Sequence, residues 1–270
     1  MKLSEKKIVL GVGFTQDSED KILEYLTATI LKGKEKVKIV TPNPEMLLFA
    51  RKDTHFKDVL NSAQVSLPDG MGVVMGSKIL KRGIHTRITG VDFMEKLTKR
   101  VSDDIEKSAK RKASIGFIGG REKVAEKAAV CLQKKYQNAE FFVYPDDINA
   151  KSFTFQFKKF RKLLNGELVS ENIKRLDILF VAFGFPTQEK WINANLPHIS
   201  VTCAMGVGGA FDVISGKIKR APKILQTTGL EWSWRLARQP WRIKRQIKLI
   251  QYPYFIIAEK FGRSVGRAGK

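Results

Sequence analysis

The 270-residue chain has only two cysteines and three histidines, and it lacks any long apolar run. Two cysteines cannot build a disulfide framework, and three scattered histidines do not form a metal-binding pattern. No eighteen consecutive residues are apolar, so no segment is predicted to span a membrane. The apolar run near the N-terminus is too short for a signal peptide. These absences predict a cytosolic protein and leave contact with a membrane surface open.

Several familiar catalytic patterns are also missing. No Ser-His-Asp or Cys-His arrangement stands out, no Walker lysine follows a glycine-rich loop, and no Asp-x-Asp pair lies in a loop suited to a metal-bound nucleotide. We therefore predict no metal site and no cofactor. If the substrate is a sugar nucleotide, cationic side chains have to stabilise the leaving diphosphate in place of a metal.

Acidic residues are scarce: 49 Lys and Arg stand against 27 Asp and Glu, a net charge of +22. This excess predicts a polyanionic partner, which nucleic acid, an anionic membrane or a phosphate-bearing substrate would satisfy. It is strongest near the C-terminus, where residues 216–270 hold fourteen Lys and Arg against Glu231 and Glu259. Charge alone does not select among these partners.

Short β-branched runs alternate with longer segments of helical periodicity. Strands are predicted at 7–14, 36–41, 63–68, 113–120, 139–145, 176–184 and 199–208, and helices at 20–33, at 121–136 and from Pro44. The more polar stretch 146–175 is predicted to be helical. This alternation indicates an α/β fold with a Rossmann-like, mostly parallel sheet flanked by helices.

Polar and glycine residues gather where the predicted strands end, in loops at 41–43, 68–70, 119–120, 184–189 and 206–209. Because ligands bind beyond the carboxyl ends of parallel strands, we expect these loops to share one edge of the sheet. Asp69, between Pro68 and Gly70, is either a turn residue or a catalytic carboxylate. Its place at a strand end favours the catalytic role.

Two glycine clusters offer places where the backbone can approach a ligand. Gly119 and Gly120 precede a predicted helix, where they either cradle a phosphate or form a tight turn. The second cluster holds Gly206, Gly208 and Gly209 and is followed by Asp212. This aspartate either accepts a hydrogen bond from a nucleobase or sugar, or caps a glycine-rich turn.

The segment that begins at Pro240 has an amphipathic pattern. On a helix, Ile243, Ile247, Ile250 and Tyr254 form an apolar stripe, with Arg242, Lys244, Arg245 and Lys248 on the opposite side. The pattern is typical of a helix on an anionic membrane, but packing against the domain explains it equally well. We predict a catalytic domain at 1–222 and a basic, membrane-targeting helical appendage at 223–270.

Several motifs in order resemble one family. They are Thr41-Pro-Asn43-Pro-Glu45, Pro68-Asp69-Gly70-Met-Gly72-Val73, Arg87-Ile-Thr-Gly90-Val-Asp92, Gly184-Phe-Pro186-Thr-Gln188-Glu189-Lys-Trp191, the stretch from Val207 to Pro222 containing Phe211-Asp212 and Arg220, and Gly229-Leu-Glu231-Trp232 with Arg235. Across residues 8 to 250 the set resembles the WecG/TagA/CpsF bacterial glycosyltransferases.

The resemblance implies transfer of an N-acetylmannosamine-type sugar from a UDP donor to undecaprenyl-diphosphate-linked N-acetylglucosamine, in teichoic acid or polysaccharide synthesis. It implies inversion, no metal, and a peripheral place on the inner face of the cell membrane. UDP-mannosaminuronate and UDP-glucose are alternative donors within the family. Outside the family, a nucleic-acid-binding protein and a non-catalytic membrane scaffold are the rival classes, although no known nucleic-acid-binding fold is visible. A homo-oligomer is left open.

The resemblance also implies roles for individual residues. Asp69 is the proposed general base, with Thr41 and Asn43 near it, and Arg87 and Gln188 line the pocket. A carboxylate at a strand end, held between proline and glycine, suits a base that must meet the acceptor hydroxyl. An arginine-rich appendage closes the site, and its matching positions are Arg235, Arg242 and Arg245.

Overall fold

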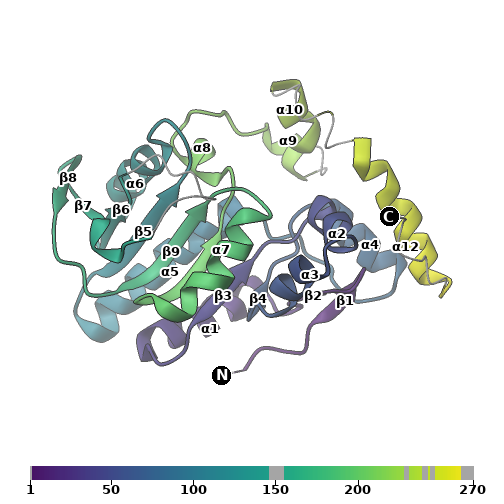
Figure 1. Cartoon of the computed structure of the whole chain (residues 1–270), viewed down its shortest axis with the longest axis horizontal. Coiled ribbons are helices and arrows are strands. Elements are labelled where there is room, and N and C mark those ends of the chain that lie inside the picture. The colour runs from purple at the N-terminus through teal and green to yellow at the C-terminus, as the bar shows by residue number, and fades with distance from the viewer. Residues whose placement is uncertain (1, 146–154, 228–230, 239–242, 244–246, 263–270) are drawn as a thin grey trace.

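The computed structural model describes residues 2–145, 155–227, 231–238, 243 and 247–262. Its centre is an eight-stranded sheet in the order β4-β3-β10-β9-β5-β6-β7-β8 (Figure 1). The strands are β3 (Val37–Val40), β4 (Val65–Ser66), β5 (Ala113–Gly119), β6 (Ala139–Val143), β7 (Arg161–Leu164), β8 (Glu167–Ser170), β9 (Leu176–Ala182) and β10 (Val201–Gly206). All are parallel except β7 and β8 at one edge. The predicted Rossmann-like, mostly parallel α/β fold is confirmed.

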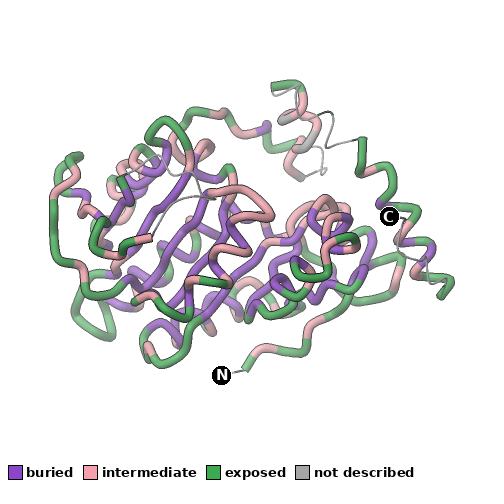
Figure 2. The backbone as a smooth tube through the Cα atoms, viewed as in Figure 1, coloured by how far each residue is buried: buried purple, intermediate pink, exposed green. Residues whose placement is uncertain are grey.

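Helices cover both faces of this sheet. One face carries α1 (Glu19–Lys32), α5 (Gly90–Ala109), α6 (Val124–Lys135) and α8 (Ala210–Ile214), and the other carries α7 (Thr187–Asn195) and the 3-10 turns η1 (Phe157–Lys159) and η2 (Leu196–His198). Along β5, Phe117 joins the core beneath the first group, whereas Ile118 joins the core beneath α7. Strands buried on both faces explain their nearly continuous apolar runs (Figure 2).

A second core lies beside the β4 edge. It is built from α2 (Pro44–Ala50), α3 (Thr54–Asn61), α4 (Met71–Ile79), a hairpin of β1 (Lys7–Val9) and β2 (Val12–Phe14), and the late helix α12 (Gln251–Lys260). Figure 1 shows α12 beside α2 and α4 although it is distant in sequence. No helix in the described ranges is long and apolar enough to cross a membrane.

The contact between α12 and α4 depends on small residues. Tyr252 and Ile256 are buried, and the Tyr252 hydroxyl donates to the Gly72 carbonyl at 3.0 Å. A Cβ at Gly76 would lie 2.6 Å from the Tyr252 oxygen and 2.8 Å from Ile256 Cδ1. Of the two interpretations of this segment, packing against the domain therefore holds for one face of α12.

The predicted stripe of Ile243, Ile247, Ile250 and Tyr254 is exposed, as a membrane contact requires. It does not form one helix, because the 3-10 turn η4 (Ile247–Ile250) precedes α12. Arg242, Lys244 and Arg245 lie outside the described residues, whereas Lys248 is exposed. The domain boundary at 222 stays a prediction, since α12 shares a core with the N-terminal half.

The single strand predicted at 7–14 is wrong. Residues 7–14 instead fold into the antiparallel β1–β2 hairpin, outside the main sheet. Leu10 and Gly11 both have positive φ, 49° and 78°, as a two-residue turn between twisted strands requires. The apolar pattern continues through the turn and hides it.

The helix predicted within 146–175 is also wrong for the residues that the structure describes there. β7 and β8 form a hairpin whose turn, Asn165-Gly166, has positive φ at both positions, and it extends the sheet beyond β6. Asn-Gly is a strong hairpin signal. The surrounding polar, basic sequence concealed it. Residues 146–154 lie outside the described ranges.

Candidate active site

The loops that follow β3 and β4 are fastened together at the carboxyl edge of the sheet. The two strands are parallel neighbours, and the Leu67 N–H continues their ladder by donating to the Val40 carbonyl at 2.8 Å. Beyond it, the Asp69 N–H donates to the Pro42 carbonyl at 3.2 Å. These bonds set Asp69 against the Thr41–Asn43 loop, as the sequence predicts.

The loop that carries Arg87 joins the same edge. The Ile88 N–H donates to the Pro68 carbonyl at 3.0 Å, directly before Asp69. Gly90, the first residue of α5, lies against Thr41, and a Cβ built on it would be 3.5 Å from Thr41 Cγ2. Three motifs that are separated in sequence therefore meet here, and they bring Thr41, Asp69 and the Arg87 loop together.

Local geometry holds the two central polar side chains. Asn43 caps α2, and its Oδ1 accepts from the Met46 N–H at 3.0 Å. Asp69 is half-buried. Pro68 before it is buried, and Gly70 after it has a φ of 91° and is the N-cap of α4. Asp69 therefore lies in the short loop between β4 and α4, and its backbone is held at the edge where the loops converge.

Arg87 is held by the C-terminal segment. Its guanidinium donates to the Gln226 carbonyl at 2.9 Å and to Glu231 Oε2 at 2.6 Å. The side chains of Arg87 and Glu231 are each only 13% exposed. Gln226 belongs to α9 (Lys223–Thr227) and Glu231 begins α10 (Glu231–Arg238). A charge-assisted bond shielded from water is stronger than a surface ion pair, so it ties these helices to the site.

A second arginine extends this network. Arg220 binds Asp92 through both terminal nitrogens, and its Nε lies 4.0 Å from Glu231 Oε1. The hydrogen bond from Arg220 is the main reason that the pKa of Asp92 lies below its ordinary value. Arg87, Asp92, Arg220 and Glu231 thus form one charged network between α5 and the C-terminal helices.

Gln188 lies beneath the neighbouring loops. It is 4% exposed, and its Oε1 accepts from the Gly184 N–H at 3.1 Å and the Gly208 N–H at 3.0 Å. Its Nε2 donates to Glu189 Oε1 at 2.8 Å. The structure therefore shows Gln188 as the link between the loops after β9 and β10.

Comparison with known proteins identifies the family of the chain. The family model described as "Glycosyl transferase WecG/TagA/CpsF family" matches residues 7–266. The chain belongs to this family. The resemblance drawn from the ordered motifs is confirmed.

Two relatives show how far the similarity extends. The N-acetylglucosaminyldiphosphoundecaprenol N-acetyl-beta-D-mannosaminyltransferase of Bacillus subtilis (strain 168) is 30% identical over 259 residues, which cover 95% of this chain and 93% of the relative. The protein of the same name from Staphylococcus aureus (strain MW2) is 30% identical over 254 residues, covering 93% and 91%. The similarity spans the glycosyltransferase chain nearly end to end.

The glycines predicted to bind substrate lie at the same edge of the family fold, but two of their amides are already engaged. Gly120 N–H donates to the Ala182 carbonyl at 2.9 Å, and Gly208 N–H to Gln188. Gly119 and Gly206 lie in close contacts, with the Phe183 ring and the Gln188 side chain respectively. Their close packing explains the glycines at these positions, and a binding role stays a prediction.

Asp212 and the appendage arginines complete the predicted set. Asp212 lies on α8, with Oδ1 3.9 Å from Lys217 Nζ and Oδ2 near exposed Gly209. Arg235 belongs to α10, but its side chain is not described, and Arg242 and Arg245 lie outside the described residues. Their roles stay predictions. In the described ranges, no group of three His, Cys, Asp or Glu residues is placed to hold a metal ion.

Sequence reasoning assigned no role to three charged residues that are buried or largely shielded from water. Glu189 and Lys38 are buried beneath the site, and Glu231 holds Arg87. The signal for Lys38 was a cation inside the apolar strand 36–41, and Glu189 and Glu231 stood within the quoted motifs. A buried charge in such a place needs a partner, so each marks a specific contact.

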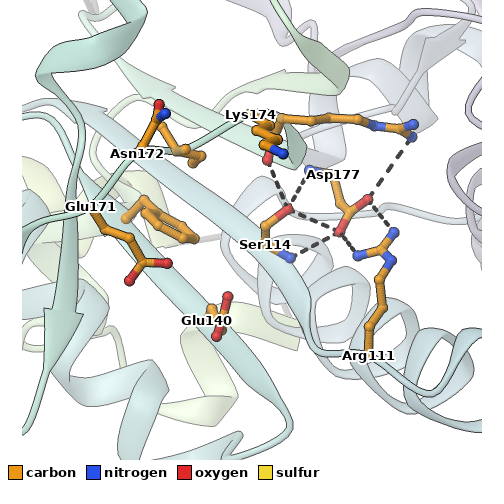
Figure 3. Close-up of a pocket in the computed structure, with 10 residues that line it drawn as sticks. Arg111, Ser114, Glu140, Glu171, Asn172, Lys174 and Asp177 are labelled. Atoms are coloured by element: carbon orange, nitrogen blue, oxygen red, sulfur yellow. Dashed lines mark hydrogen bonds and ion pairs between the residues drawn. The ribbon is translucent and has the colours of Figure 1, made fainter.

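The pocket drawn in Figure 3 lies at the opposite end of the sheet. It has a volume of about 330 Å³ and includes Ser114 and Asp177, near the starts of β5 and β9. Asp177 is buried and accepts from both terminal nitrogens of Arg111, at 2.6 and 2.8 Å, and from the Ser114 N–H. Its bonds are internal, which is typical of a structural cluster rather than a reacting group.

Proposed function

We propose that this protein transfers an N-acetylmannosamine-type sugar from a UDP donor to undecaprenyl-diphosphate-linked N-acetylglucosamine, in teichoic acid or polysaccharide synthesis. The names of the two relatives supply the acceptor and the sugar. The observation that carries the proposal is the convergence of the Asp69, Thr41–Asn43 and Arg87 loops at the carboxyl edge of the sheet.

In the proposed reaction Asp69 is the general base. Its carboxylate takes the proton of the acceptor hydroxyl, whose oxygen attacks the anomeric carbon from the face opposite UDP. The bond from that carbon to the UDP oxygen breaks, and UDP leaves with the electron pair, so the configuration inverts. The base must lie within hydrogen-bond reach of the hydroxyl, and the backbone bond from Asp69 to Pro42, at the edge where the loops converge, supports this role.

Charge on the departing diphosphate needs cations, because we propose that no metal takes part. Arg87 is the candidate that the structure describes at this edge, and Arg235, Arg242 and Arg245 are candidates from the appendage. Arginine suits this task because its planar guanidinium forms two parallel bonds to a phosphate group. A chelator is therefore expected to leave turnover unchanged.

The central experiment measures acceptor-dependent UDP release in EDTA, with UDP-N-acetylmannosamine and a lipid-diphosphate N-acetylglucosamine. Asp69→Asn is expected to lower kcat by roughly a hundredfold or more, the usual contribution of a general base. Asp58→Asn, the same change at an exposed position on α3, is the matched control and should retain wild-type turnover. Full activity of Asp69→Asn would show that Asp69 is not the general base. UDP-mannosaminuronate and UDP-glucose are the alternative donors to assay.

We also propose that the protein binds the inner face of the cell membrane through an apolar patch on packed helices. The patch consists of Met75 and Ile79 on α4, Ile250 on η4, and Tyr254, Ile257 and Phe261 on or just after α12, all exposed. Exposed Lys78, Lys248 and Lys260 belong to the same elements. An apolar surface with cations beside it suits an anionic bilayer.

Vesicle co-sedimentation tests this surface. Ile257→Ser with Phe261→Ser should weaken binding to phosphatidylglycerol vesicles at least tenfold, because each apolar side chain contributes on the order of 1.5–3 kcal/mol when buried. Leu164→Ser is the matched control, since Leu164 and Ile257 are both 50% exposed and Leu164 lies in the distant β7–β8 hairpin. Equal loss in both variants would contradict the patch.

The two rival classes predict different results. A non-catalytic scaffold would bind vesicles without any turnover, whereas nanomolar binding of duplex DNA with a steep salt dependence would favour a nucleic-acid-binding protein.

A further inference from the structure

The side chain of Glu189 is buried directly behind Gln188. It is 1% exposed, and its Oε1 accepts from Gln188 Nε2 at 2.8 Å. Among the described residues its Oε2 has no hydrogen-bond partner. A buried carboxylate with a free oxygen is costly, so its presence beneath the site calls for a role.

The amide of Gln188 has two possible orientations, and the loops need only one of them. Its Oε1 accepts from the Gly184 and Gly208 N–H groups, and a flipped amide would aim an NH₂ group at both donors. Glu189 Oε1 accepts a hydrogen bond from Gln188 Nε2, and this bond favours the first orientation. A Cβ at Gly206 would lie 2.8 Å from Gln188 Nε2, so close packing also restrains the amide.

The electrostatic surroundings favour an uncharged Glu189 carboxyl. Burial raises its pKa to about 7. The hydrogen bonds from Gln188 and from the backbone N–H of Glu189 itself, together with the charge of Lys38, oppose this only in part. Lys38, on β3, is the charged group that acts on Glu189, and its ammonium is directed to the Val59 carbonyl, Ser62 Oγ and Asn193 Oδ1.

We propose that Glu189 is a positioning residue, which orients the Gln188 amide so that the loops after β9 and β10 keep the shape that receives the sugar-nucleotide donor. The proposal rests on the proposed function, because it assigns these loops to the donor. Gly184 lies in the loop after β9, and Gly208 follows β10. Two strands of the site edge are therefore linked through one buried side-chain pair.

Exchanging the two side chains gives the sharpest test. Gln188→Glu alone places two carboxyls against each other, so the donor KM should rise about tenfold or more at pH 8, with a smaller defect at pH 6 where one carboxyl keeps a proton. In the double variant Gln188→Glu/Glu189→Gln, the new glutamine donates to the new carboxylate, which still accepts from both glycines. The double variant should restore the donor KM to within about threefold of wild type.

A second pair of variants covers the case in which Gln188→Glu does not fold. Glu189→Gln keeps an acceptor for Gln188 Nε2 and should hold the donor KM within about threefold, whereas Glu189→Leu should raise it about tenfold or more. A residue needed only for folding would lower the active fraction, and hence the apparent kcat, without moving KM. A wild-type donor KM in Glu189→Leu, or a double variant no better than Gln188→Glu, would overturn the proposal.

The exchange also separates this inference from the proposed function. A double-mutant cycle on urea unfolding measures the coupling between positions 188 and 189 without any substrate. If the wild type turns over no UDP-sugar but the cycle shows coupling, the donor assignment fails and the side-chain pair remains. If turnover is normal and the coupling is zero, the positioning role of Glu189 is refuted.

Discussion

Replacing Glu189 with glutamine should change how the free energy of unfolding depends on pH. Burial raises the pKa of the Glu189 carboxyl from its ordinary value of 4.5 to about 7 in the folded protein. Between these values the folded chain holds one proton more than the unfolded chain. Stability therefore falls as pH rises through this interval, and the loss is complete above pH 7.

The size of this loss follows from the displacement of the pKa. The difference between 4.5 and about 7 corresponds to about 3 kcal/mol, because one pH unit is equivalent to roughly 1.4 kcal/mol. Glutamine keeps the hydrogen-bond acceptor for Gln188 but has no titrating proton. The variant should therefore gain about 3 kcal/mol relative to wild type between pH 4.5 and pH 8.

Urea unfolding of both proteins, followed by circular dichroism at half-unit steps from pH 4.5 to 8, measures this difference. Subtracting the two curves cancels the titration of every other group, so any constant effect of the substitution appears only as an offset. The range stops at 8 because burial lowers the pKa of Lys38 to about 8, and its charge acts on Glu189. Parallel curves would show that Glu189 is ionised throughout and would refute the reasoning.

Four further changes have defined outcomes. Gly76→Val places a Cβ 2.8 Å from Ile256 Cδ1 and should cost about 1–3 kcal/mol of unfolding free energy in urea, with no loss if α12 does not pack there. Ile256→Ala leaves a cavity in the second core and should cost about 2–4 kcal/mol in the same measurement. Arg220→Lys removes the two-nitrogen contact with Asp92 and should cost about 1 kcal/mol or less, because both side chains are partly exposed. Arg220 lowers the pKa of Asp92, so this cost should be present at pH 6 and disappear as the pH falls below the ordinary aspartate value, and a constant difference at pH 6 and pH 3 would contradict it. Gly11→Ala puts a Cβ at a φ of 78° and should lower stability by about 1 kcal/mol, seen as a lower Tm in calorimetry.

The parallel sheet and the edge that holds the site could be predicted from sequence because both depend on local patterns. Apolar runs mark strands buried on both faces, and polar loops follow them. These patterns predict that Thr41, Asn43 and Asp69 lie at one edge of the sheet. The backbone bonds from Leu67 to Val40 and from Asp69 to Pro42 confirm that their loops are neighbours. Parallel neighbours necessarily present their carboxyl ends on one side.

The contacts of the charged residues could not be predicted in the same way. Arg87 and Glu231 are 144 residues apart, and no local pattern pairs them. The role of Gln188 depends on two backbone amides in different loops, which become neighbours only when β9 and β10 pair. The β1–β2 hairpin was missed because its turn at Leu10 and Gly11 interrupts an apolar pattern too briefly to alter it, and the β7–β8 hairpin because the polar sequence around Asn165-Gly166 does not show the alternation typical of strands.

Helix α4 connects the proposed base, Asp69, to the apolar patch that we propose binds the membrane. It begins two residues after Asp69 and ends at Ile79, within the apolar patch, and its nine residues span about 13 Å. Because α12 is seated on its glycines, the helix cannot shift without disturbing the second core. In the proposed enzyme the distance from bilayer to base is therefore a fixed property of the fold. The base then has a set place above the bilayer, and it is the acceptor that has to bring its sugar to the carboxylate.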